Sequence, residues 1–411
     1  MRLRLTLLMV VAPALLLAQK AGQEHWVATW ATAQLLARTP PAPPPAAARG
    51  FKNQTIRMIV RSSLGGSRLR VKVENAFDSA PVLLGAAHVA LRAKDSAIDA
   101  GSDRALSFSG QPSITLGPGV VLLSDPVDLK VPPLTDLAVS LYFPGETGPP
   151  TMHNTALHNT YISKEGDATA QPSIADATVT QSYYWLSSVD VVAPADALSI
   201  VAFGDSITDG ARSTNETNHS WPALLAARLA GDKKTANVAV VNLGIGGNRV
   251  LRDNSGISAL ARFDRDVLSQ SGVKWLMVLE GINDIGRAAT APAEAVTAED
   301  LIAGHKQLIE QAHAHGIKVI GCTLTPYEGA AYSRENGEAV REALNYWIRG
   351  GGAYDAVVDF EAATRDSANP KRIRAAFDPG DHLHPNDAGY QAMADAVDLS
   401  LFGGKKTGAK R

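Results

Sequence analysis

The sequence predicts two domains, a β-rich domain followed by an α/β domain built on a parallel sheet. In the first half, short segments rich in Val, Ile and Leu alternate with polar residues and are separated by Gly and Pro, which is typical of antiparallel strands. In the second half, apolar strands alternate with amphipathic helices, which indicates a parallel sheet covered by helices on both faces. Because the pattern changes between residues 193 and 197, we place the two domains at 22–195 and 196–402.

Residues 1–21 have the features of a secretory signal peptide. Arg2 and Arg4 precede an apolar run at 5–17, and we expect cleavage between Ala18 and Ala21. The run is too short to cross a bilayer comfortably, so we expect a secreted or periplasmic protein without stable membrane insertion. The single cysteine excludes a disulfide within the chain, and the formal charge of −2 gives no reason to expect a nucleic acid as partner.

The β-rich half predicts a sandwich or jelly roll, because it contains many short strands with turn residues between them. Alternation is clearest where Leu137, Val139 and Leu141 take turns with small or polar residues. Gly65 and Gly66 lie between two strands and predict a hairpin. The expected strands are 55–61, 69–73, 113–116, 120–123 and 137–143.

Two further features of this half allow more than one interpretation. The proline-rich segment 39–48 cannot form a helix or an interior strand, so we expect a surface loop there. His153 and His158 are interpreted as surface or interface residues, with the lining of a cleft as the alternative.

The α/β half predicts five strands, at 198–203, 238–242, 275–279, 318–323 and 356–360. The expected helices are 221–230, 258–269, 298–315, 335–349 and 387–401. The third helix has the clearest ends, because Thr297 and Asp300 resemble a capping box and Gly316 can terminate it. Residues 403–411 have almost no apolar side chains, and we expect them to be disordered.

Residues with useful chemistry follow the ends of these strands. Ser206 follows the first strand, the glycines at 244–247 follow the second and Asn283 follows the third, whereas Asp381 and His384 come after the fifth. Loops that follow the strands of a parallel sheet emerge at the same edge, so we expect these residues to meet there.

These residue types are the set that acyl transfer requires. The Ser206 hydroxyl must lose a proton to attack a carbonyl carbon, and a neutral imidazole can take that proton. Asp381 lies three residues before His384, a spacing that could set the carboxylate beside the imidazole and hold its tautomer. The oxyanion needs donors, and the candidates are the backbone N–H groups of Ser206 and Gly247 and the side-chain amide of Asn283.

Taken singly, these motifs also have simpler interpretations. The glycines at 244–247 could form only a tight turn, and Asn283 could serve only to cap a helix. His382 is the alternative to His384 as the base, and His219 could contact the substrate.

Taken together and in order, the motifs resemble the four sequence blocks of the SGNH, or GDSL, hydrolase family. The blocks are Gly204-Asp205-Ser206, Gly247, Gly281-Ile282-Asn283-Asp284 and Asp381-His382-Leu383-His384-Pro385. The resemblance covers 200–401 and implies a flavodoxin-like three-layer α/β/α fold, with a Ser206-His384-Asp381 triad. It also implies an oxyanion hole formed by Ser206, Gly247 and Asn283, although a slip of one residue would select Gly246 in place of Gly247. The β-rich half resembles the accessory sandwich that precedes the catalytic domain in some secreted members.

The sequence therefore predicts a secreted serine esterase that hydrolyses carboxylic esters through an acyl-enzyme and needs neither a cofactor nor a metal. Export and the accessory domain favour acetyl or short acyl groups on carbohydrate, so the expected partner is a small-molecule or polysaccharide ester. A lipase or lysophospholipase-type activity is the main alternative, and fold alone does not decide between them. The alternative of a different class is an inactive carbohydrate-binding protein on the same scaffold. The sequence predicts neither the substrate-binding residues nor the oligomeric state.

Overall fold

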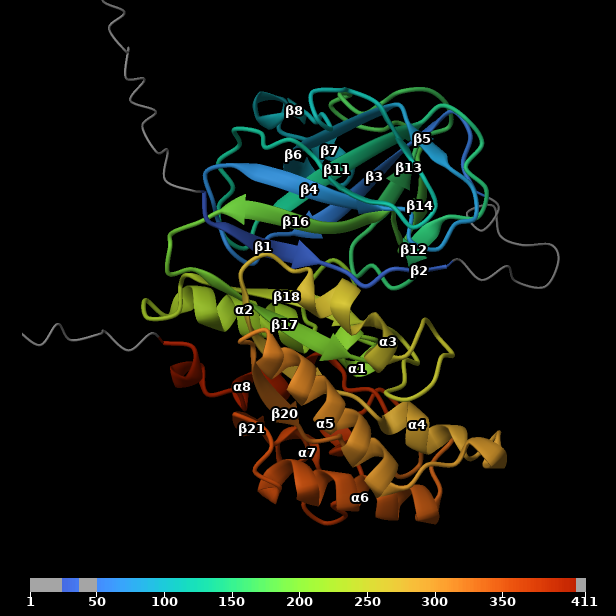
Figure 1. The fold of residues 1–411 in the computed structure, drawn as a ribbon, viewed down its shortest axis with the longest axis vertical. Helices are drawn as coiled ribbons and strands as arrows, with labels where there is room; N and C mark the ends of the chain where they lie inside the picture. The colour runs from blue at the N-terminus through green and yellow to red at the C-terminus, as the bar shows by residue number, and fades with distance from the viewer. Residues whose placement is uncertain (1–23, 37–49, 404–411) are drawn as a thin grey trace, which may run out of the picture.

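The computed structural model describes residues 24–36 and 50–403. The expected signal peptide at 1–21, the proline-rich segment 39–48 and residues 404–411 of the expected tail lie outside these residues. In the described part, the β-rich half stacks on the α/β half along the long axis of the molecule (Figure 1). The architecture changes between Val192, the end of the last antiparallel strand, and Leu198, the start of the first parallel strand.

Two main antiparallel sheets form the β-rich half. One contains, in spatial order, β1 (Trp26–Ala31), β16 (Leu186–Val192), β4 (Leu69–Glu74) and β10 (Val121–Leu123). The other contains β14 (Thr178–Thr180), β13 (Thr160–Ile162), β3 (Gln54–Arg61), β11 (Asp136–Phe143), β6 (Ala86–Lys94) and β7 (Ala97–Ile98), with β8 (Arg104–Ala105) paired to β6. Side chains from both sheets, such as Met58, Val71 and Val189, share one buried core, which is the arrangement of a β-sandwich.

Two smaller antiparallel sheets complete this half. One pairs β15 (Tyr183–Tyr184), β12 (Thr151–His153) and β2 (Leu35–Leu36), and the other pairs β5 (Val82–Leu84) with β9 (Ile114–Leu116). The first of them lies on the side of the sandwich that faces the α/β half (Figure 1).

The hairpin predicted at Gly65 and Gly66 is wrong. The strands on either side, β3 and β4, belong to different sheets, so the chain crosses here from one sheet to the other. A Cβ atom on Gly66 would lie 2.6 Å from the Cβ of Val191, and one on Gly65 would lie 2.7 Å from the carbonyl oxygen of Val131. Close approach of neighbouring segments therefore explains these glycines, and no turn between paired strands is involved.

The α/β half contains a five-stranded sheet in which every pairing is parallel, as the sequence predicts. Its spatial order is β18 (Val238–Gly244), β17 (Leu198–Gly204), β19 (Val273–Leu279), β20 (Lys318–Cys322) and β21 (Ala356–Val358). In chain order this is 2-1-3-4-5, the flavodoxin-like topology. The expected fold class is therefore confirmed.

The five expected helices are present with differences near two ends, but three short α-helices, α1, α4 and α7, were not predicted. The expected helix 258–269 is α3 continued by a π-helical turn, and the expected helix 387–401 ends at Asp395, because Asp398 caps a separate 3₁₀ turn. The α-helices are α1 (Ser206–Asp209), α2 (Trp221–Gly231), α3 (Ala259–Phe263), α4 (Ile282–Arg287), α5 (Ala298–Ala314), α6 (Glu335–Gly350), α7 (Phe360–Thr364) and α8 (Asp387–Asp395). The shorter turns of the α/β half are η3 (Asp264–Leu268), η4 (Pro292–Glu294), η5 (Ala375–Phe377) and η6 (Leu399–Leu401). The β-rich half contains η2 (Ala100–Ser102).

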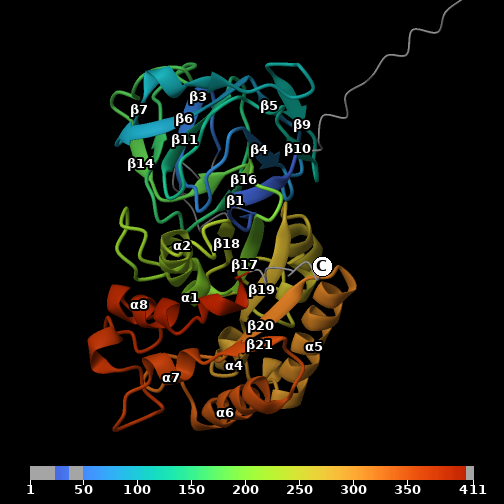
Figure 2. The same cartoon turned by 90° about the vertical axis from the view of Figure 1, so that its left-hand side faces the viewer.

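Alternate residues of the parallel strands pack against opposite layers. Ile200 of β17 belongs to the core that contains α2 and α8, whereas Phe203 belongs to the core that contains α3 and α5. Figure 2 shows α2 and α8 on one side of the sheet and α5 on the other. Helices do not cover the second face completely, because alanines from β1 and the segment after it pack there against β17 and β18. The two halves thus share a hydrophobic core.

Polar contacts at one end of this interface hold a loop of the α/β half. Glu216 accepts hydrogen bonds from Arg92 (2.6 Å) and from the backbone N–H of Asn159 (2.5 Å), and His158 lies 3.5 Å away. Burial opposes the charge on Glu216, but the hydrogen bonds from His158, Asn159 and Arg92 outweigh it and lower the pKa to about 2. The charged form of Glu216 therefore stabilises the contact between the two halves.

Glu216→Gln should lower the free energy of unfolding by about 2 kcal/mol at pH 7, because Arg92 and the backbone N–H of Asn159 lose a charged acceptor. The pKa of Glu216 is lowered from 4.5 to about 2 on folding, so its stabilising contribution is complete above pH 5 and is lost as the pH falls towards 2. Denaturant unfolding of both proteins should thus give a difference that shrinks from pH 5 to pH 2. A difference that stays constant across this range would contradict the assignment. Glu146→Gln, which removes an exposed pair with Lys52, serves as the control and should change stability less.

Candidate active site

The sharp turn between β17 and α1 presents Ser206 at the carboxyl edge of the sheet. Asp205 caps α1, since its side chain accepts a hydrogen bond from the backbone N–H of Ile207 at 2.9 Å. Gly204 permits the turn, because a Cβ atom there would collide with the side chain of Thr208 and the carbonyl of Leu279. Ser206 is half-buried, whereas most residues around it in the turn are buried. The local sequence thus leaves the hydroxyl of Ser206 accessible at the end of a buried strand.

Ser206, His384 and Asp381 form a hydrogen-bonded chain. The Oγ atom of Ser206 lies 2.8 Å from Nε2 of His384, and Nδ1 of His384 lies 3.0 Å from Oδ2 of Asp381. The other oxygen of Asp381 accepts the backbone N–H groups of Leu383 (3.1 Å) and His384 (3.0 Å). Burial opposes the charge on Asp381, but the hydrogen bonds from His384 outweigh it and hold the pKa well below its usual range. A charged Asp381 keeps the proton of His384 on Nδ1, which leaves Nε2 free to accept the proton of Ser206.

Arg212 adds a contact to this chain that the sequence did not predict. Its Nε atom donates to Oδ2 of Asp381 at 2.9 Å, and its side chain is 60% exposed. Arg212 and Glu216 belong to the same loop, and Glu216 contacts Arg92 of the β-rich half. This loop therefore contacts both the carboxylate of Asp381 and the β-rich half.

The expected oxyanion donors lie in the segments that follow β17, β18 and β19. Asn283, in the first turn of α4, donates from Nδ2 to the backbone oxygen of Asn248 at 3.0 Å and accepts at Oδ1 from the hydroxyl of Tyr332 at 3.3 Å. Tyr332 therefore fixes which end of the amide is the donor, a role that the sequence analysis missed. Among the residues that the structure describes, the backbone N–H groups of Ser206, Gly246 and Gly247 have no hydrogen-bond partner. A Cβ atom on Gly246 would lie 3.9 Å from the Cβ of Ser206, and Gly247 has a φ of +78°, so both remain candidates.

The alternative histidines have other partners. His382 lies 2.5 Å from Asp378, adopts a φ of +59° and packs its ring near Gly329. His219 lies 2.9 Å from Asp387, the first residue of α8. Of the three candidates, the structure brings His384 to Ser206.

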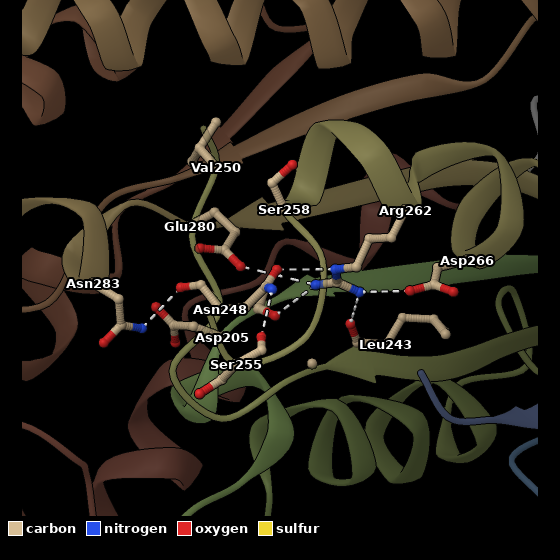
Figure 3. A network of polar contacts seen from close by, with 12 residues as sticks. Asp205, Leu243, Asn248, Val250, Ser255, Ser258, Arg262, Asp266, Glu280 and Asn283 are labelled. Carbon is tan, nitrogen blue, oxygen red and sulfur yellow. Dashed lines mark hydrogen bonds and ion pairs between the residues drawn. The ribbon is translucent and has the colours of Figure 1, made fainter. Parts of the chain in front are cut away.

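Beneath the site, Arg262 joins the ends of three strands (Figure 3). Its guanidinium donates to the carbonyl of Gly204 at the end of β17 (2.9 Å) and to that of Leu243 in β18 (2.7 Å). It also donates to Oδ1 of Asn248 (2.9 Å) and to Asp266 (2.9 Å), and it lies 3.8 Å from Glu280. One buried cation thereby fixes the positions from which the loops carrying Ser206, Gly246 and Asn283 depart.

Buried carboxyl groups surround this cation. Burial, together with the charges of neighbouring carboxyl groups, raises the pKa of Asp205 to about 7 and raises that of Glu280 well above its usual value. Burial likewise raises the pKa of Asp284 to about 6, although its hydrogen bonds to the backbone of Val250 and Leu251 oppose the shift. The cation of Arg262 pairs with Asp266 at 2.9 Å and is the charge that opposes the rise in the pKa of Glu280, so removing it would break a buried ion pair.

Arg262→Met should therefore lower the free energy of unfolding by about 3–5 kcal/mol, the usual effect of breaking a buried ion pair. Chemical denaturation measures this value, and a second substitution, Glu280→Gln, should restore part of the loss. The matched control is Arg365→Met on an exposed side chain, which should change stability by less than about 0.5 kcal/mol. Equal effects of the two methionine variants would mean that the buried cation has no special role.

The described residues form neither a metal site nor a membrane-spanning helix. Within 24–36 and 50–403, no group of three or more His, Cys, Asp and Glu side chains is arranged to hold a metal ion. No helix in these ranges combines the length and apolar character needed to cross a bilayer.

Comparisons with known proteins concern the α/β half. Residues 202–392 match the model of the GDSL-like Lipase/Acylhydrolase family. A lipolytic protein of the G-D-S-L family from Desulfitobacterium hafniense DCB-2 is 24% identical, with a TM-score of 0.37, and covers 48% of this chain and 96% of its own. A catalytic mutant of an acetylxylan esterase from Geobacillus stearothermophilus is 22% identical, with a TM-score of 0.40, and covers 51% of this chain and 95% of its own. LAE5, an alpha/beta hydrolase from the metagenome of Lake Arreo in Spain, is 24% identical, with a TM-score of 0.39, and covers 50% of this chain and 96% of its own.

A search of curated proteins gives no significant match. Residues 202–392 of this chain are a domain of the GDSL-like lipase/acylhydrolase family.

Proposed function

We propose that this chain is an exported serine esterase that hydrolyses carboxylic esters through an acyl-enzyme. The observation that carries the proposal is the chain from Ser206 through His384 to Asp381, with distances of 2.8 Å and 3.0 Å, at the carboxyl edge of the sheet. Membership of the acylhydrolase family supports the same reaction class. A nucleophile, a base and an orienting carboxylate in this geometry are the parts that ester hydrolysis needs.

In the proposed reaction, Nε2 of His384 takes the proton of Ser206 while Oγ forms a bond to the carbonyl carbon of the ester. The negative charge that develops on the carbonyl oxygen accepts hydrogen bonds from the N–H of Ser206, the amide of Asn283 and the N–H of Gly247 or Gly246. The C–O bond to the alcohol then breaks, and the alcohol leaves with the proton from His384. Water repeats the sequence on the acyl-enzyme, which releases the acid and restores Ser206.

The proposed substrates are acetyl or short acyl esters of a carbohydrate outside the cytoplasm. The composition of residues 1–21 supports export. Two polar side chains beside the triad are exposed, Arg212 by 60% and His382 by 49%, and such groups suit the hydroxyl groups of a carbohydrate. Initial rates on acetylated polysaccharides and on acyl esters of increasing chain length distinguish this substrate class from a lipase-type one. Rates that rise with chain length would favour the lipase-type reaction.

Ser206→Ala should lower kcat for a chromogenic acetate ester by about 10⁴-fold or more, because no other hydroxyl can take over the attack. His384→Ala should have a similar effect, whereas the matched control His382→Ala should retain activity within a few-fold. Circular dichroism checks that each variant is folded. Hydrolysis by Ser206→Ala at the wild-type rate would refute the assignment of Ser206 as the nucleophile. If the wild-type protein binds glycan but hydrolyses no ester, the carbohydrate-binding alternative is favoured.

A further inference from the structure

A histidine of the β-rich half contacts the helix that carries the nucleophile. His153, the last residue of β12, points its Nε2 atom at Oδ1 of Asp209 across a distance of 3.0 Å. Asp209 is the last residue of α1, and Ser206 is the first. Both side chains of the pair are buried, with 2% and 5% of their surface exposed. The contact therefore joins the two halves directly behind the candidate active site.

The hydrogen bonds of His153 indicate that the pair is ionic. Its Nδ1 atom lies 2.7 Å from the carbonyl oxygen of Ala33, which can only accept, and its Nε2 atom faces a carboxylate. The imidazolium donates from both nitrogens, so a positive His153 beside a negative Asp209 satisfies both contacts. Burial opposes this charge, but the carboxylate of Asp209 and the two hydrogen bonds outweigh it and raise the pKa of His153.

Helix α1 depends on such contacts, because it is only four residues long. A single turn is not stable alone, so its orientation is set by the groups that hold it. Asp205 holds its first turn, and the side chain of Asn242 donates to the carbonyls of Thr208 (2.8 Å) and Asp209 (3.2 Å). His153 is the contact that comes from the other domain. Ser206 and Asp209 are the two ends of this single turn, so any tilt of the turn moves Ser206.

The pair lies beside a cavity, so neighbouring groups would not compensate for its loss. His153 and Asp209 line a cavity of about 100 Å³ between the two halves, together with Trp30, Tyr183 and Asn242. A smaller side chain at position 153 would enlarge this cavity and leave the carboxylate of Asp209 without its cation. A shift of about 1 Å in a reacting group can lower the rate about 10²-fold.

We propose that His153 is a positioning residue, which holds Ser206 at its hydrogen-bond distance from His384 through Asp209, and that the β-rich half is therefore part of the catalytic unit. This inference rests on the proposed function. It assigns the first domain a role in the reaction itself, in addition to any contact with substrate. The shared core at the alanines of residues 28–33 and the docking of Glu216 fit the same role.

The test compares variants of the full-length chain at a temperature where circular dichroism shows each to be folded. His153→Phe keeps a ring but no donor, and it should lower kcat for a chromogenic acetate ester about 10- to 100-fold with KM within about 3-fold. The rate at which a serine-directed phosphonate reacts with the protein should fall by the same factor. His153→Gln, which can still donate to Asp209, should recover part of both rates. If His153→Phe does not fold, Asp209→Asn replaces it and should lower both rates in the same way.

The matched control is Lys72→Met, which removes a hydrogen bond to Ser269 (3.0 Å) across the same interface. Ser269 precedes β19, at the opposite edge of the sheet from Ser206, so this variant should lose stability but keep kcat. Wild-type rates in His153→Phe, or an equal loss of kcat in Lys72→Met, would overturn the positioning role. The outcome differs from failure of the proposed function, in which the wild-type protein itself would show neither hydrolysis nor reaction with the phosphonate.

Discussion

The hydrogen bond between Ser206 and His384 joins groups that are 178 residues apart, and the proposed chemistry depends on it. Two features of the fold make it possible. The parallel sheet sends the loops after β17, β18 and β19 to the same edge, and the segment after β21 returns there with Asp381 and His384. The backbone N–H groups around Asp381 then hold its carboxylate so that the imidazole faces the hydroxyl.

The site is held from below and from behind by charges that are buried. Arg262 fixes the ends of the strands beneath the loops, and His153 holds the turn that carries Ser206 from the side of the other domain. Buried charges are costly unless they are paired, so each of them persists only where the surrounding groups are fixed. The same constraint favours a preorganised site, in which little has to move when charge develops on the substrate. On this account the interface between the two halves is as important for the site as the loops themselves.

The strands of the parallel sheet and the order of the functional residues could be predicted, because apolar runs and the loops after them are local features. The partner of His153 could not, since Asp209 lies 56 residues away in the other domain. Arg262 was missed because an arginine within a predicted helix is usually exposed, whereas this one lies on the buried side with Phe263. The crossing at Gly65 and Gly66 was mistaken for a hairpin, because close packing and tight turns select the same residue.

The most direct test of the proposed chemistry is a crystal structure of the full-length chain after reaction with a short-chain phosphonate ester. The account predicts a bond from phosphorus to Oγ of Ser206, with the phosphonyl oxygen about 2.7–3.1 Å from the N–H of Ser206 and the amide of Asn283. It also predicts one further donor, the N–H of either Gly246 or Gly247. A phosphonate on another residue, or a phosphonyl oxygen that points away from these donors, would contradict the account.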